Sequence, residues 1–185
     1  MKNIWNKKIL LLIALLVISL GFGGCVTDYD TLEPIPTYPD LDVSQFNTTA
    51  TIEYVPLANA LLNKNILEAL KTNNYQDVIS GSHYKADRSN PVRILVPLDI
   101  QSKVLYCKEG YFQEVRIIVM VREPGEIINE ELSYPPPRYF QAYSQMQLVG
   151  QIPQVEESNR GIEQAVENLF KIREFRSALE PVGKQ

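Results

Sequence analysis

The strongest strand signal in the chain is the stretch from residue 111 to residue 122, which reads YFQEVRIIVMVR. Apolar β-branched residues stand at every second position in it: Val115, Ile117, Val119 and Val121. Successive side chains of a strand point to opposite faces, so these four share one face, and Glu114, Arg116 and Arg122 share the other. The stretch therefore predicts a half-buried antiparallel strand with one apolar face.

Further strands are predicted on both sides of this stretch along the chain. Residues 92–100 read VRILVPLDI and extend toward residue 106, and Lys108-Glu109-Gly110 indicates the hairpin turn that follows. Pro97 has no N–H to donate to a ladder, so we expect it at a sheet edge or at a bulge. Residues 138–149 predict another strand with these inward side chains: Phe140, Ala142, Met146 and Leu148. Residues 124–137 are expected to form a long loop without secondary structure.

Two helices complete the pattern. Leucine and isoleucine recur at helical spacing after Pro56, and Lys71 and Asn73 indicate where that helix ends. Residues 156–179 carry a second apolar stripe, in which the stem of Arg173 takes part. With a short strand at 49–55, the element order is β-α-β-β-β-α. This order predicts an α+β fold, a two-layer sandwich in which two helices cover a mostly antiparallel sheet of about four strands.

Length and charge limit the domain organisation and the partners. The chain has 185 residues, with 22 acidic and 18 basic side chains and a net charge of −4. This balance disfavours a general nucleic-acid binder. Residues 47–181 are expected to form a single α+β domain, followed by a tail of residues 182–185.

The first 25 residues have a pattern typical of export. Lys2, Lys7 and Lys8 precede an uncharged run from residue 9 to residue 22, which is short for a spanning helix of about 20 apolar residues. Gly23-Gly24-Cys25 at the end of this run resembles the lipobox of bacterial lipoproteins. The resemblance implies that residues 1–24 are a signal peptide and that Cys25 becomes the lipidated N-terminus. The alternatives are an uncleaved short anchor, or ordinary cleavage that leaves a free thiol.

The lipobox resemblance also implies a location. A lipid on Cys25 would hold the chain in the cell envelope, facing the periplasm, and Val26 favours the outer membrane where two membranes exist. Residues 25–46 lack periodicity and hold Pro34, Pro36 and Pro39, so we expect a stiff tether there. In outline, the lipobox and the element order resemble periplasmic accessory lipoproteins of the lipopolysaccharide-assembly type and of the ABC-transport auxiliary type.

Catalytic motifs are missing from the sequence. His83 is the one histidine, which excludes the HExxH motif and two-histidine metal sites, and neither a P-loop nor a G-x-S-x-G elbow occurs. Cys107 ends an apolar run, where a buried cysteine is expected and a reactive thiol is the alternative. We therefore expect no enzyme activity, no cofactor and no bound metal.

Binding is the function that the pattern favours. The candidate partner-binding residues combine aromatic rings with amides, a combination suited to recognition: Tyr134, Tyr139, Gln141, Tyr143 and Gln145. The simpler interpretation of this row is the polar face of a sheet. We expect a membrane-anchored, non-catalytic accessory that binds an envelope protein or a glycolipid.

Two other functions stay open. One is a solute- or lipid-binding lipoprotein with a pocket between sheet and helices. The other is a cell-wall hydrolase that acts through a loop containing Glu126, Glu130 and Glu131.

Overall fold

The computed structural model describes residues 27–28, 32–81, 92–123, 126–128, 131–133 and 135–181. Its elements in chain order are β1 (Thr27–Asp28), η1 (Val43–Gln45), β2 (Ile52–Tyr54), α2 (Ala60–Thr72), β3 (Val78–Ser80), β4 (Arg93–Cys107), β5 (Gly110–Arg122), β6 (Glu126–Ile128), β7 (Glu131–Ser133), β8 (Arg138–Gln147), α3 (Val155–Phe170) and α4 (Arg173–Leu179). The predicted signal peptide, Cys25, His83, Tyr134 and the tail lie outside the described residues. Within them, no helix has the length and apolar character needed to cross a membrane.

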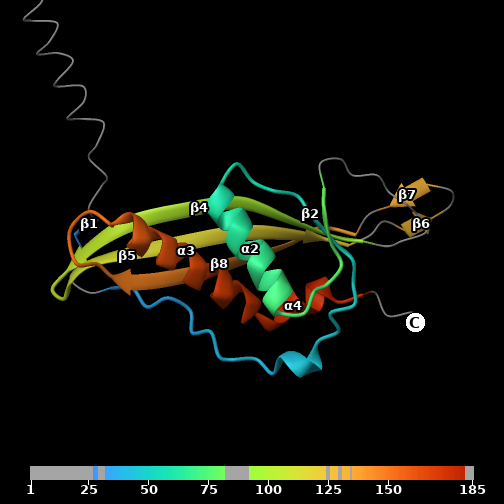
Figure 1. Ribbon diagram of the computed structural model, residues 1–185, viewed down its shortest axis with the longest axis horizontal. Helices are drawn as coiled ribbons and strands as arrows, with labels where there is room; N and C mark the ends of the chain where they lie inside the picture. The colour runs from blue at the N-terminus through green and yellow to red at the C-terminus, as the bar shows by residue number, and fades with distance from the viewer. Residues whose placement is uncertain are drawn as a thin grey trace, which may run out of the picture.

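One mixed sheet forms the framework of the fold (Figure 1). Its strand order is β3-β2-β4-β5-β8, and β1 also pairs with β4. The pairs β4–β5 and β5–β8 are antiparallel, whereas β2 runs parallel to both β3 and β4, and β1 runs parallel to β4. The α+β class is confirmed, but the prediction of about four mostly antiparallel strands is partly wrong.

Two short strands that the sequence did not predict, β1 and β3, account for most of this difference. β1 has two residues and β3 has three, too few to show an alternating pattern in the sequence. Helix α2 joins β2 to β3, and a crossover of this kind brings its two strands together in parallel. The prediction overlooked β1 and β3 and, with them, two of the three parallel pairs among the described strands, β1–β4 and β2–β3.

Pro97 lies at an irregularity of β4, as the sequence predicts. The register of the β4–β5 ladder shifts between Pro97 and Asp99. On its other side, β4 pairs with β2 only at 93–95 and with β1 only at 105–106. Pro97 therefore lies at a bulge, in a part of β4 that has no second neighbour among the described strands. No hydrogen bond of the ladder is lost because Pro97 lacks an N–H.

The core lies between the sheet and the helices α2 and α3, which cover one face (Figure 1). The four inward residues predicted on β5 are fully buried, and α2 contributes Leu62, Ile66 and Leu70. Helix α2 begins at Ala60, later than the predicted start at Pro56. The reason is local, because the side-chain oxygen of Asn59 accepts the Leu62 N–H at 2.9 Å and caps the helix there.

The predicted helix 156–179 is in fact two helices, α3 and α4. Arg176 is buried and its Nε donates to the Phe170 carbonyl at 2.6 Å, which satisfies a backbone acceptor at the end of α3. The break reorients α4 so that Phe175 packs edge-on against both Phe140 and Phe170. Arg173, expected on the apolar stripe, is exposed instead.

The expected structureless loop at 124–137 is also corrected. β6 and β7 pair as a short antiparallel hairpin, with Ile127 opposite Leu132. Glu126 and Glu131 stand in its strands, while Glu130 lies outside the described residues.

We expect Leu70→Ala to lower the free energy of unfolding by about 2–5 kcal/mol, because it leaves a cavity in a fully buried site. Leu67 on the same helix is 42% exposed, so Leu67→Ala is the matched control and should lose about 1 kcal/mol or less. Urea denaturation of both variants measures the two values. Equal losses would contradict the placement of α2 on the sheet.

Candidate functional site

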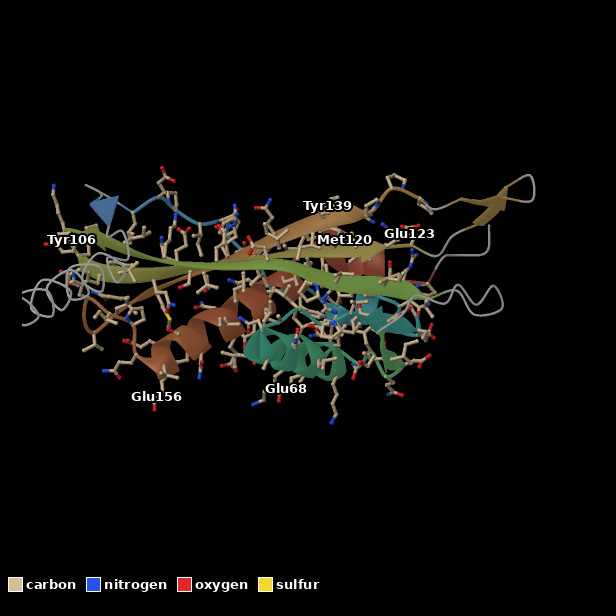
Figure 2. All side chains as sticks on the ribbon, turned by 90° about the horizontal axis from the view of Figure 1, so that it is seen from above. Glu68, Tyr106, Met120, Glu123, Tyr139 and Glu156 are labelled. Carbon is tan, nitrogen blue, oxygen red and sulfur yellow. The ribbon has the colours of Figure 1, made fainter. Side chains whose placement is uncertain are left out.

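The sheet face that α2 and α3 leave uncovered carries the candidate site. We call it the open face. Figure 2 shows Met120 and Tyr139 on this side of the sheet, while Glu68 of α2 and Glu156 of α3 lie on the helix side. Tyr139 is 60% exposed, an unusually large aromatic surface in contact with solvent.

The N-terminal segment 32–46, which we call the strap, packs along the β8 edge of the domain. The Tyr143 N–H of β8 donates to the Tyr38 hydroxyl at 2.9 Å, and the Gln145 amide donates to the Glu33 carbonyl at 3.4 Å. Farther along the strap, Asp40 forms an ion pair with Lys171 at 2.9 Å. The described part of the predicted tether is therefore held against the domain.

The last residue of the strap meets a buried cation. The Arg176 guanidinium lies over the Phe46 ring, 5.4 Å from its centroid, and 5.9 Å from that of Phe170. Burial lowers the pKa of Arg176 because it disfavours the charged form. The two aromatic rings act in the opposite direction, since their faces attract the positive guanidinium. The strap thus runs from the open face to the ends of the helices (Figure 1).

The prolines of the strap explain why it does not simply add a strand to β8. Pro34, Pro36 and Pro39 have no N–H, so a regular ladder with the edge of β8 cannot form. Side chains bind the backbone of β8 in place of a ladder. The Tyr38 hydroxyl accepts the Tyr143 N–H, and the Asn168 amide donates to the Tyr143 carbonyl at 2.7 Å. Both backbone groups of Tyr143 at the edge are thereby satisfied.

A groove of about 520 Å³ lies between the strap and the open face. One wall is the strap at 33–36, and the other is the sheet, which contributes Gln101, Ser102, Lys103, Glu114, Arg116 and Tyr143. The register explains why these groups meet, because Arg116 of β5 stands between Gln101 of β4 and Tyr143 of β8.

The polar groups of the groove are linked to one another. Lys103 and Glu114 form an ion pair at 2.8 Å, and the Arg116 Nη2 donates to the Gln101 Oε1 at 2.9 Å. Gln101 in turn donates to Asp99 at 2.7 Å. Among the described residues no carboxylate pairs with Arg116, and its Nε is buried without a hydrogen-bond partner. The groove therefore offers a guanidinium to an acidic group.

The structure brings together part of the predicted binding row. Tyr143 lines the groove and its hydroxyl donates to the Gln141 Oε1 at 2.9 Å. Gln145 is engaged by the strap, and Tyr139 stays exposed on the same face. The sequence placed Arg116 on the outward face of its strand but gave no register, so its place opposite Tyr143 was not predicted.

Cys107 is a buried free cysteine, as expected of a structural one. Its Sγ donates to the Glu109 Oε2 at 2.9 Å. Burial, together with this carboxylate, raises the pKa of the thiol, which favours its protonated form. Within the described ranges, no three His, Cys, Asp or Glu side chains gather into a metal-binding group.

Comparison with known proteins gives structural likeness only. No protein-family model matches the chain, and no curated protein does. Among solved structures, a minor lipoprotein from Acinetobacter baumannii is similar, with 13% identity over 72% of this chain and 94% of that one and a TM-score of 0.41. A protein from Caulobacter crescentus CB15 that is classed provisionally as a lipoprotein is also similar, with 13% identity over 77% and 97% of the two chains and a TM-score of 0.38.

We expect Tyr38→Phe to loosen the strap from β8, because the Tyr143 N–H loses its acceptor. The Tyr143 amide should exchange with deuterium faster, and stability should fall by about 1 kcal/mol. Tyr139→Phe is the control, since that ring is exposed. The same exchange rate at Tyr143 in Tyr38→Phe and in the unaltered protein would contradict the contact.

Proposed function

We propose that this protein is a membrane-anchored envelope lipoprotein, a non-catalytic accessory that binds a protein or glycolipid partner through its open face. The anchor part rests on the sequence, where Gly23-Gly24-Cys25 follows the basic residues and the apolar run of an export signal. The lipid on Cys25 would sit in the membrane and the domain would face the periplasm, and Val26 favours the outer membrane in a cell with two.

The observation that carries the binding part is the groove between the strap and the sheet. It is already formed, because the contacts of Tyr38 and Asp40 fix the strap in place. A binding surface that needs little ordering loses little affinity to conformational entropy. Arg116 supplies a charge for a carboxylate or a phosphate, and Tyr139 supplies exposed aromatic area farther along β8 on the same face.

A solute-binding lipoprotein is the second candidate, and the same groove supports it. Its volume of about 520 Å³ falls in the range of small-ligand sites. The groove lies on the open side of the sheet, however, whereas the sequence predicted a pocket between the sheet and the helices. Its lining is largely charged and polar, with two carboxylates and two cations, which disfavours an apolar solute.

The anchor is tested by the mass of the native N-terminal peptide after detergent extraction. We expect a chain that begins at Cys25 and carries diacylglyceryl and acyl groups, and we expect Cys25→Ser to lose this added mass. Cys107→Ser is the matched control, because that buried cysteine should leave the lipid in place. A chain that begins at Met1, or at an unmodified Cys25, would overturn the anchor.

Binding at the open face is tested by photo-crosslinking in cells. A benzoylphenylalanine at Tyr139 should give discrete adducts with one envelope component. The control is the same group at Glu68 on the helix side, whose side chain is 62% exposed, close to the 60% of Tyr139. A protein adduct and a glycolipid adduct differ in mass and in protease sensitivity. Equal labelling at both positions would count against the open face.

A further inference from the structure

One end of the sheet gathers segments that are far apart in sequence, and we call it the hairpin end. The β4–β5 turn is there, with Tyr106 opposite Tyr111. β1 lies beside it, because Asp28 pairs with Tyr106. The exit of β8 lies there too, since the Leu148 N–H donates to the Tyr111 carbonyl at 2.8 Å. Figure 2 shows Tyr106 and Glu156 at this end, with Glu123 at the opposite end.

Three aliphatic side chains project into solvent where β8 leads into α3, two from the loop and one from the first residue of the helix. Val149 is 92% exposed, Ile152 is 82% exposed and Val155 is 77% exposed, the three largest values among the exposed large hydrophobic residues described. Single exposed aliphatic residues are common on soluble domains. Three within seven positions indicate a surface that contacts a membrane or another apolar surface.

This loop has a fixed shape. One carboxylate holds both of its ends, because Glu157 accepts the Val149 N–H at 3.1 Å and the Gln154 N–H at 2.8 Å. Glu157 itself is buried and closes a capping box at the start of α3. The hydrogen bonds of Glu157 therefore fix the loop in a shape that points its apolar side chains toward solvent.

The neighbouring side chains suit a boundary between lipid and water. Tyr106 is 40% exposed and its ring centroid lies 4.9 Å from that of Tyr111. Tyrosine is enriched at such boundaries, because its ring is apolar and its hydroxyl can stay in water. The exposed charges at this end are of both signs, from Lys108, Glu109 and Glu156. Without an excess of positive charge, they favour lipids whose headgroups carry no net charge.

The chain also brings the proposed lipidation site to this end. Thr27 pairs with Leu105, and Cys25 precedes Thr27 by two residues, which at most span about 7 Å. A lipid on Cys25 would therefore enter the bilayer at the same end of the sheet as Val149, Ile152 and Val155.

We propose that the hairpin end docks on a bilayer of zwitterionic lipid, with the apolar loop between β8 and α3 inserted among the headgroups of the leaflet that holds the lipid of Cys25. The inference rests on the proposed lipid anchor for its orientation. It adds a second, protein-borne membrane contact, so the domain stands on the membrane in one orientation instead of hanging from a flexible tether.

A single tryptophan tests the docking. Trp5 is the one tryptophan of the sequence and lies in the predicted signal peptide, so the processed chain would have none. Ile152→Trp places the reporter in the loop, and Glu68→Trp places a control on α2. Each full chain is extracted with its lipid and reconstituted in phosphatidylethanolamine–phosphatidylcholine vesicles, with or without bromine on the acyl chains.

We expect brominated lipid to remove roughly half of the emission of the Ile152→Trp chain, because interfacial loops enter the headgroup and acyl boundary by about 5–10 Å. The emission of the Glu68→Trp chain should not change. Equal emission of the Ile152→Trp chain with and without bromine, in protein that floats with the vesicles, would overturn the docking, including the case in which a protein covers the loop.

The failure of the anchor gives a different result. A chain without lipid mass on Cys25 would overturn the proposed anchor. The same chain, added to an excess of vesicles, still tests the loop: bromine quenching of the Ile152→Trp emission supports the docking, and its absence overturns it.

Discussion

The ladder between β4 and β5 is the constraint on which the rest of this structure depends. It runs from the pair Ile94–Arg122 to the pair Cys107–Gly110, with one irregularity at Pro97. Because side chains alternate along a strand, this one register decides which residues of β5 face α2 and α3 and which line the groove. It also defines the two ends of the molecule, which lie at the β4–β5 turn and at the β6–β7 hairpin (Figure 1).

The strap covers the edge of β8, which would otherwise be exposed. Strand edges invite pairing with other chains, and prolines are one way in which proteins prevent it. Here the prolines run beside the edge while Tyr38 and Asn168 satisfy the backbone of Tyr143 with side-chain groups. The result is an edge that is covered but leaves a groove, since a strap without a ladder cannot pack as closely as a strand.

The sequence predicted what long patterns specify. The inward residues of β5, the hairpin turn at Gly110 and the irregularity at Pro97 all followed from local chemistry. It did not predict β3, the start of α2 at Ala60 or the break before α4, because short elements leave little periodicity and because Arg176 stacks on Phe46, a contact distant in sequence. For the site, Tyr139 and Tyr143 were found from their face, whereas the place of Arg116 opposite Tyr143 required the register.

The length of β4 has a consequence for reach. Its 15 residues, at about 3.3 Å each, make a stiff sheet roughly 50 Å long. If the β4–β5 turn rests on a lipid surface, the far hairpin of β6 and β7 stands at nearly that height above it, and the groove lies in between on a side wall. A domain docked in this way would present each of its surfaces at a set distance from the plane of the membrane.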